Sequence, residues 1–106
     1  MVFSLKKEEL NELKNSLEYE KESITAKTIL KKDAKMIAGL AFDRGQSIMP
    51  CTSTVNLTLH ILEGNAEVMI SGQNYDINEG DEIFMPKNKI HALFAKTKLK
   101  LALLKD

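Results

Sequence analysis

Hydrophobic and polar residues alternate along much of the chain after Ser23. The alternation is clearest at 36–42, 55–61 and 99–103. In the middle segment, apolar residues occupy positions 55, 57, 59 and 61, and polar residues occupy the positions between them. A period of two is typical of strands with one buried face. These segments therefore predict strands, and His60 is expected on the face opposite Leu57 and Leu59.

Turn-forming residues separate the predicted strands. Asp, Asn, Gly and Ser gather at 43–45, 63–65, 71–74 and 78–81, and Pro86 ends a further apolar run. Turns at this regular spacing are typical of an all-β sandwich or a closed barrel. We expect about seven to nine strands, because strands of ordinary length would fill the chain at this spacing.

The beginning of the chain shows a helical pattern instead. Phe3, Leu10, Leu13 and Leu17 fall on one face at helical spacing, and most other residues there are charged. Ser4 is a suitable N-cap, with acidic residues following in the first turns. We predict a helix over residues 4–20 that lies outside a β-barrel formed by residues 23–106. The length fits a single domain, 1–106.

Composition and charge exclude several classes of protein. The 106 residues are 43% hydrophobic and 28% charged, with a formal net charge of zero, so no overall field attracts nucleic acid or an anionic membrane. No apolar run is long enough to span a bilayer, and the N-terminus lacks the apolar run of a signal peptide. Cys51 is the only cysteine, which fits a reducing compartment. We expect a cytoplasmic protein that binds neither nucleic acid nor membrane.

The charges are unevenly distributed along the sequence. Residues 63–82 contain six acids and no lysine or arginine, whereas residues 87–106 contain six lysines and one acid. Solvated outer faces of strands explain this pattern best. A surface that contacts a partner is the alternative.

The stretch 62–93 resembles the centre of a cupin domain, and the flanking sequence is similar to small single-domain cupins of bacteria, of the RmlC-like, cupin-2 type. The glycine, proline and histidine positions of the two cupin motifs are matched by Gly45, Gly64, Gly80, Pro86 and His91. The resemblance implies an all-β jelly-roll barrel of two antiparallel sheets, here with a short N-terminal helix.

The same resemblance implies where a metal would be bound. The four ligand positions of the family fall on Cys51, Ser53, Leu57 and His91, and only His91 keeps the family residue. Leucine cannot coordinate a metal, and a neutral serine is a poor ligand for iron, zinc or nickel. We therefore expect a degenerate metal site and no cofactor. A divalent iron, zinc or nickel ion held by His91 and Cys51 is the less favoured alternative.

The resemblance also places His91 inside the barrel with Cys51 beside it. A thiol next to an imidazole can act as a nucleophile with its base. However, the sequence identifies no orienting carboxylate and no oxyanion hole. We favour a His91 that is satisfied by polar neighbours and a buried, inert Cys51. For His60 we favour a surface position over a place in a subunit interface.

The favoured function is binding of a small, largely apolar or weakly polar molecule in the barrel lumen, rather than catalysis. The expected lining is Cys51, Ser53, Leu57, Leu59, Ile83, Met85, His91 and Leu93. One alternative is a metal-dependent enzyme of the dioxygenase, isomerase or decarboxylase type that uses Cys51 and His91. Another is a non-catalytic interaction module. We also expect a homodimer, since small cupins commonly dimerise and segment 23–30 can add to the edge of a neighbouring sheet.

Overall fold

The computed structural model describes residues 6–32 and 35–106, and within them it contains one helix and nine strands. The elements are α1 (Lys7–Ser16), β1 (Ile24–Lys32), β2 (Lys35–Phe42), β3 (Ser47–Cys51), β4 (Leu57–Glu63), β5 (Asn65–Ile70), β6 (Gln73–Asn78), β7 (Glu82–Met85), β8 (His91–Ala95) and β9 (Leu99–Lys105). The predicted strands and turns are confirmed. No helix among the described residues is long and apolar enough to cross a membrane.

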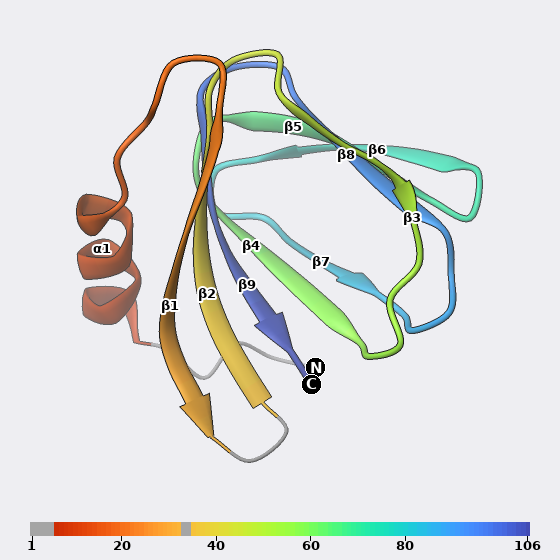
Figure 1. The fold of residues 1–106 in the computed structure, drawn as a ribbon, viewed down its shortest axis with the longest axis horizontal. Helices are drawn as coiled ribbons and strands as arrows, with labels where there is room; N and C mark the ends of the chain where they lie inside the picture. The colour runs from red at the N-terminus through yellow and green to blue at the C-terminus, as the bar shows by residue number, and fades with distance from the viewer. Residues whose placement is uncertain (1–5, 33–34) are drawn as a thin grey trace.

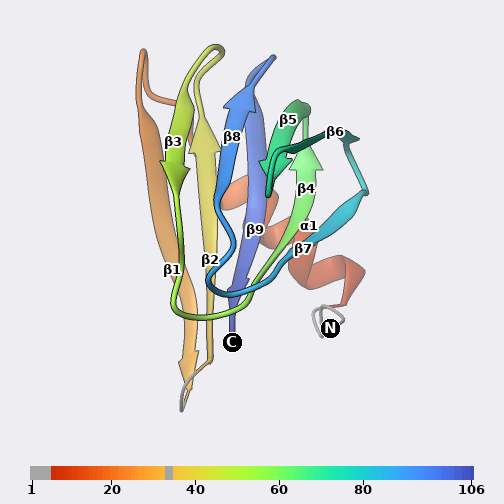
Figure 2. The same ribbon diagram turned by 90° about the vertical axis from the view of Figure 1, so that its right-hand side faces the viewer.

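The strands form two antiparallel sheets. One has five strands in the order β1-β2-β9-β4-β7, and the other has four strands in the order β3-β8-β5-β6. The two sheets face each other, with the four-stranded sheet in front in Figure 2. β6 and β7 are the edge strands on one side, and they diverge from the turn that joins them (Figure 1). The two-sheet barrel predicted from the sequence is therefore confirmed.

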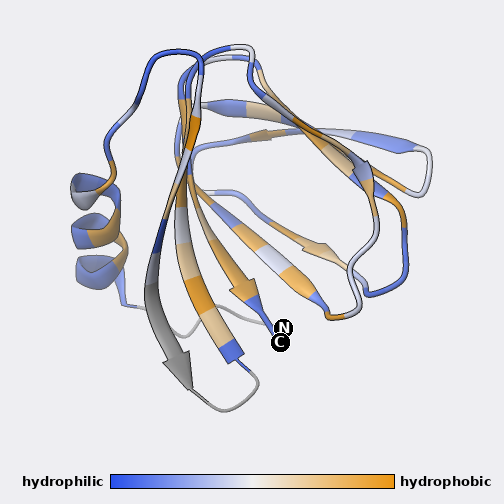
Figure 3. Cartoon of the chain, viewed as in Figure 1, coloured by the Kyte–Doolittle hydropathy of each residue, from blue (hydrophilic) through white to orange (hydrophobic). Residues whose placement is uncertain are grey.

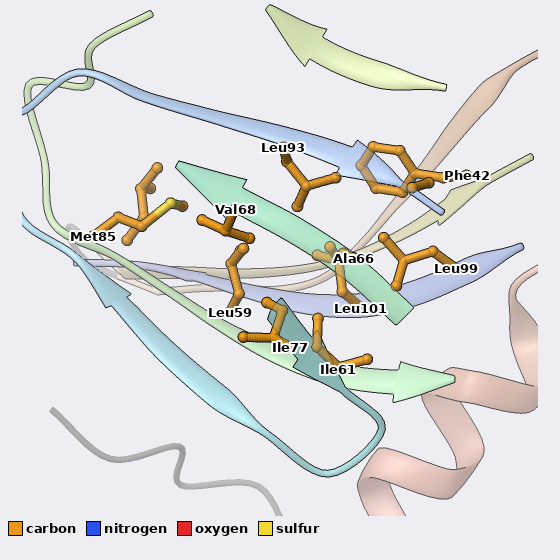
Figure 4. Packing of buried hydrophobic residues seen from close by; sticks show 12 residues of the cluster. Phe42, Leu59, Ile61, Ala66, Val68, Ile77, Met85, Leu93, Leu99 and Leu101 are labelled. Carbon is orange, nitrogen blue, oxygen red and sulfur yellow. The ribbon is translucent and has the colours of Figure 1, made fainter. Parts of the chain in front are cut away.

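An aliphatic core fills the space between the two sheets. Its members come from the inward-facing positions of seven strands, as the alternation in the sequence predicts. Phe42 and Leu99 lie at one end of this core and Met85 lies at the other (Figure 4). The fully buried members are Phe42, Ile61, Ala66, Val68, Ala95, Leu99 and Leu101.

A second apolar cluster lies on the outer face of the five-stranded sheet, where α1 packs. Leu10, Leu13 and Leu17 of the predicted stripe contact this face, and Figure 3 shows the hydrophobic positions of α1 on the side toward the strands. Gly39 allows the close approach, since a Cβ there would lie 2.7 Å from Cδ1 of Leu13. The strand positions in the cluster are Ile37, Ala41, Leu62, Ala102 and Leu104. Phe3 and Ser4 lie outside the described residues.

The helix is shorter than predicted. It ends at Ser16, and the backbone of Leu17 is extended, with φ −87° and ψ 137°. Leu17 packs on the sheet, and the hydroxyl of Tyr19 donates a hydrogen bond to Glu63 in β4. The helical prediction for residues 17–20 is wrong because these tertiary contacts outweigh the local pattern.

Candidate functional site

The barrel core is closed at one end and more open at the other. At the closed end Phe42 lies opposite Leu99, and both are fully buried. At the open end of the five-stranded sheet the last inward pair is Leu57 and Met85. These two side chains are 7% and 5% exposed. This end, called the open end below, is therefore the less completely buried end of the core.

A histidine and a cysteine lie in the last row of the four-stranded sheet. His91 in β8 is directly opposite Cys51 in β3 and Ile70 in β5. His91 shares the inward face of β8 with Leu93 and Ala95, and it is 7% exposed. The structure thus brings Cys51, Ile70 and His91 together at the open end.

The two ring nitrogens of His91 have different neighbours. Nε2 lies 3.5 Å from Sγ of Cys51, and Nδ1 lies 3.3 Å from the carbonyl oxygen of Lys89. A carbonyl oxygen only accepts hydrogen bonds, so in a neutral ring Nδ1 carries the proton. Nε2 then accepts the S–H of Cys51. His91 therefore has two polar neighbours, as the sequence favoured.

The prediction of a buried Cys51 is wrong, because the residue is exposed; that it is inert stays a prediction. Cys51 is the last residue of β3, an edge strand, and the register with β8 shifts between Ile48 and Cys51. An edge position next to such an irregularity leaves one side of the residue uncovered by sheet. The thiol is therefore accessible to solvent while it contacts a buried imidazole.

The other predicted pocket residues have two kinds of environment. Ser53 belongs to the turn before β4, where its hydroxyl accepts a hydrogen bond from the Val55 N–H at 3.1 Å. Its carbonyl accepts one from the Asn88 N–H at 2.7 Å. The remaining positions are part of the aliphatic core or pack against it: Leu57, Leu59, Ile83, Met85 and Leu93.

The side chains around Cys51 and His91 do not fit a metal centre of the usual kind. A catalytic metal normally needs about three protein ligands. The described residues contain no group of three or more His, Cys, Asp or Glu side chains that could hold a metal ion. Of the two other implied ligand positions, Leu57 is aliphatic, and the Ser53 hydroxyl bonds to backbone. We therefore derive no chemistry through a metal.

A groove of about 510 Å³ opens between the diverging edges β6 and β7. Ile70, Ile77 and Ile83 form its apolar part, and Ile83 is also one of the predicted pocket residues. Because Ile70 is the cross-strand neighbour of His91, the groove lies next to the Cys51–His91 pair. Its other lining residues are Tyr75, Asp76, Glu82, Phe84 and Pro86.

Two side-chain contacts, one from Lys96 and one from His60, hold the acidic residues of this groove. Oδ1 of Asp76 accepts a hydrogen bond from Nζ of Lys96 at 2.7 Å, and this bond lowers the pKa of Asp76, with a further contribution from Asn65. Oε2 of Glu82 lies 2.9 Å from Nδ1 of His60. His60 lies on the outward face of β4, as the alternation predicts.

A polar cluster surrounds Tyr19 and was not predicted from the sequence. Its hydroxyl donates to Glu63, and the ammonium groups of Lys98 and Lys100 lie 5.3 and 5.1 Å from the centre of its ring. Burial, followed by the hydrogen bond to Glu63 and the charge of that carboxylate, raises the pKa of Tyr19. Since residues 19 and 63 are 44 positions apart, no local pattern reveals this contact.

No protein-family model and no curated protein matches the chain. Solved structures do match. A conserved protein of unknown function from Streptococcus pyogenes shares 29% identity over 81% of this chain and 75% of its own, with a TM-score of 0.76. A cupin superfamily protein from Desulfitobacterium hafniense shares 22% identity over 84% of this chain and 82% of its own, with a TM-score of 0.80. An RmlC-like cupin from Shewanella frigidimarina shares 18% identity over 79% of this chain and 76% of its own, with a TM-score of 0.76. Together with the two facing antiparallel sheets, these matches show that the chain has the fold of a small RmlC-like cupin, a jelly-roll barrel with one short helix.

Proposed function

We propose that this domain binds a small, largely apolar molecule at the open end of its barrel, without a tightly held metal. The observation that carries the proposal is the 3.5 Å contact between the exposed thiol of Cys51 and the buried imidazole of His91. Small-molecule sites typically combine apolar walls with a few polar groups that fix the orientation of the ligand. A polar pair at the end of an aliphatic core is such a combination.

The apolar part of the ligand would contact the outer rows of the core. Leu57 and Met85 form the last inward pair of the five-stranded sheet, and Ile83 is opposite Leu59 one row deeper. Met85 suits this role because its flexible thioether adapts to ligands of different shape. Leu59 and Leu93 lie deeper and would form the floor. The proposal thus keeps the predicted lining and places the ligand at its outer end.

The polar part of the ligand would contact His91 and Cys51. The Lys89 carbonyl fixes the proton on Nδ1 of His91, so Nε2 faces the ligand as an acceptor. A ligand hydroxyl or amide N–H can replace the thiol at Nε2, while the thiol turns toward solvent. The site therefore favours a ligand with one hydrogen-bond donor beside an apolar body.

The test is a screen of fragment-sized apolar compounds by native mass spectrometry and by thermal shift. A stoichiometric ligand should raise the melting temperature of the wild-type protein. Its affinity should fall about fivefold or more in His91→Leu, since a lost hydrogen bond costs about 1 kcal/mol. Phe94→Leu is the matched control, because Phe94 is exposed on the outer face of the four-stranded sheet. A barrel that stays empty and shifts with no compound would contradict the proposal.

A metal-dependent enzyme is the second candidate. The observation in its favour is that a thiol and an imidazole, both common metal ligands, lie in contact in this site. Metal analysis of protein purified without a histidine tag separates the two candidates. Stoichiometric iron, zinc or nickel that is lost in both Cys51→Ala and His91→Ala would favour the enzyme and overturn the metal-free proposal.

A further inference from the structure

The groove between β6 and β7 contains carboxylates as well as apolar side chains. Its lining includes the carboxylates of Asp76 and Glu82, with no lysine, arginine or histidine. The turn that joins the two strands adds Glu79 and Asp81, both exposed. The lining therefore offers carboxylate oxygens to a ligand, next to the Lys96 ammonium that is bound to Asp76.

Both groove carboxylates keep an oxygen for a ligand. The described hydrogen bonds of Asp76, from Lys96 and Asn65, go to Oδ1, and that of Glu82 involves only Oε2. Within the described part of the chain, Oδ2 of Asp76 and Oε1 of Glu82 accept no hydrogen bond. Lys96 and His60 thus hold the two carboxylates in place and leave one acceptor oxygen on each.

The rest of the groove suits a flat apolar body. Tyr75 and Phe84, one from each edge strand, are 45% and 43% exposed, although each has a large apolar ring. Ile70 and Ile83 lie beside them in the groove. The volume of about 510 Å³ is in the range of ordinary small-molecule sites. Exposed aromatic rings beside aliphatic side chains favour an aromatic partner.

We infer that this groove binds small molecules that combine an aromatic body with a protonated amine. The aromatic body packs on Ile70 and Ile83 between the rings of Tyr75 and Phe84. The ammonium group donates to Oε1 of Glu82, where opposite charges attract. This inference rests on the proposed function, because Ile83 belongs to both the groove and the open end of the barrel, and it names the chemical class of the ligand.

Three probes with the same aromatic body test the charge requirement: 1-naphthylmethylamine, which is cationic at neutral pH, 1-naphthylmethanol, which is neutral, and 1-naphthylacetate, which is anionic. In isothermal titration calorimetry at low ionic strength, the amine should bind about threefold or more tighter than the alcohol, as expected for one partly exposed ion pair. The acetate should bind more weakly than the alcohol. Raising the salt concentration to about 1 M should remove most of the difference.

Matched variants locate the probe in the groove. Glu82→Gln should reduce the advantage of the amine over the alcohol, whereas Glu67→Gln should leave it unchanged, because Glu67 is an exposed carboxylate outside this groove. Phe84→Ala should weaken all three probes about threefold or more, and Phe94→Ala should not. Both aromatic residues are exposed, so these variants are expected to fold, and circular dichroism melting checks this.

The outcomes separate this inference from the proposed function. Equal binding of all three probes, or an amine advantage that survives Glu82→Gln, overturns the amine class and leaves the proposed apolar site intact. Failure of every naphthyl probe also overturns the inference. The proposed function fails separately, when the wider screen of apolar compounds finds an empty barrel.

Discussion

The side chains of Cys51 and His91 meet across two strands that are 40 positions apart in the sequence. The register of β3 with β8 places the two residues directly opposite each other, at the open end of the barrel. Because Cys51 is the only cysteine of the chain, any reaction of a thiol reagent with the protein reports on this one contact.

Replacing His91 should make the thiol less reactive. In His91→Leu the S–H of Cys51 loses its acceptor, and with it the neighbouring base that can take the proton as the thiol reacts. We expect alkylation of the folded protein by iodoacetamide to slow about threefold or more, measured by intact mass. As a control, the rates of wild type and variant should coincide in concentrated urea. Equal rates in the folded proteins would contradict the contact.

Gly39 should be required for the docking of α1. A Cβ in Gly39→Ala would lie 2.7 Å from Cδ1 of Leu13 and 3.0 Å from the Cδ atoms of Leu17, so these side-chain ends must repack. We expect a loss of about 1–3 kcal/mol in the free energy of unfolding, typical of overpacking. In a Leu13→Ala background the same substitution should cost clearly less, since space is then available. A double-mutant cycle by urea denaturation measures this coupling, and additive effects would contradict it.

Two turn glycines should differ in their tolerance of alanine. At Gly64 a Cβ would lie 2.1 Å from the carbonyl oxygen of Lys98, and φ is +94°. At Gly72 φ is +84°, but nothing lies within 4 Å. Gly72→Ala should therefore cost about 1 kcal/mol, from backbone strain alone. Gly64→Ala should cost about 3 kcal/mol or more, because backbone must also shift. Thermal and urea unfolding would compare the two, and similar losses would count against the close approach.

Tyr19 should make the protein sensitive to alkali. Its pKa in the folded state is raised above the ordinary value of 10.0, so the folded protein holds the phenol proton more tightly than the unfolded chain does. This contribution to stability is complete below pH 10 and is lost as the pH rises from there toward the folded pKa. The melting temperature should thus fall less steeply above pH 10 in Tyr19→Phe than in wild type. Tyr75→Phe, an exposed tyrosine, is the control and should follow wild type.

The expected homodimer stays a prediction, and two surfaces are available for it. One is the outer face of the four-stranded sheet, where Met49 and Phe94 are 74% and 46% exposed. The other is β1, the edge strand of the five-stranded sheet. Light scattering at micromolar concentration should give about twice 11.9 kDa. Phe94→Glu should dissociate a dimer built on the sheet face and leave one built on β1 unchanged. A monomeric mass for wild type would refute the dimer.

The fold was predictable from the sequence because its signals are local and repeated. The alternating pattern predicts that Leu57, Leu59 and Ile61 point into the core and that His60 points outward. The structure confirms both. The helical stripe at Leu10, Leu13 and Leu17 likewise identifies the face of α1 that packs on the sheet. The end of α1 was missed because the contacts of Tyr19 with β4 are not visible in a local pattern.

The site was only partly predictable. The family spacing brings Cys51 and His91 together, and the structure does place them in contact. The family spacing does not reveal that β3 is an edge strand with a shifted register. The exposure of Cys51 was missed for this reason. The acidic groove could not be predicted from the sequence either, because it depends on which strands form the edges of the two sheets. The sequence showed the acids of 63–82 but not the surface they share.

The filled, closed end of the barrel limits how far a ligand can enter. Phe42, Leu99 and Ala95 leave no exposed surface there, so a bound compound can contact only the outermost rows of side chains. In the proposed binding mode, the barrel would hold only one terminal group of a ligand, with the remainder of a longer compound in solvent. Compounds that share an end group should bind alike whatever their length, including when that end is attached to a larger carrier.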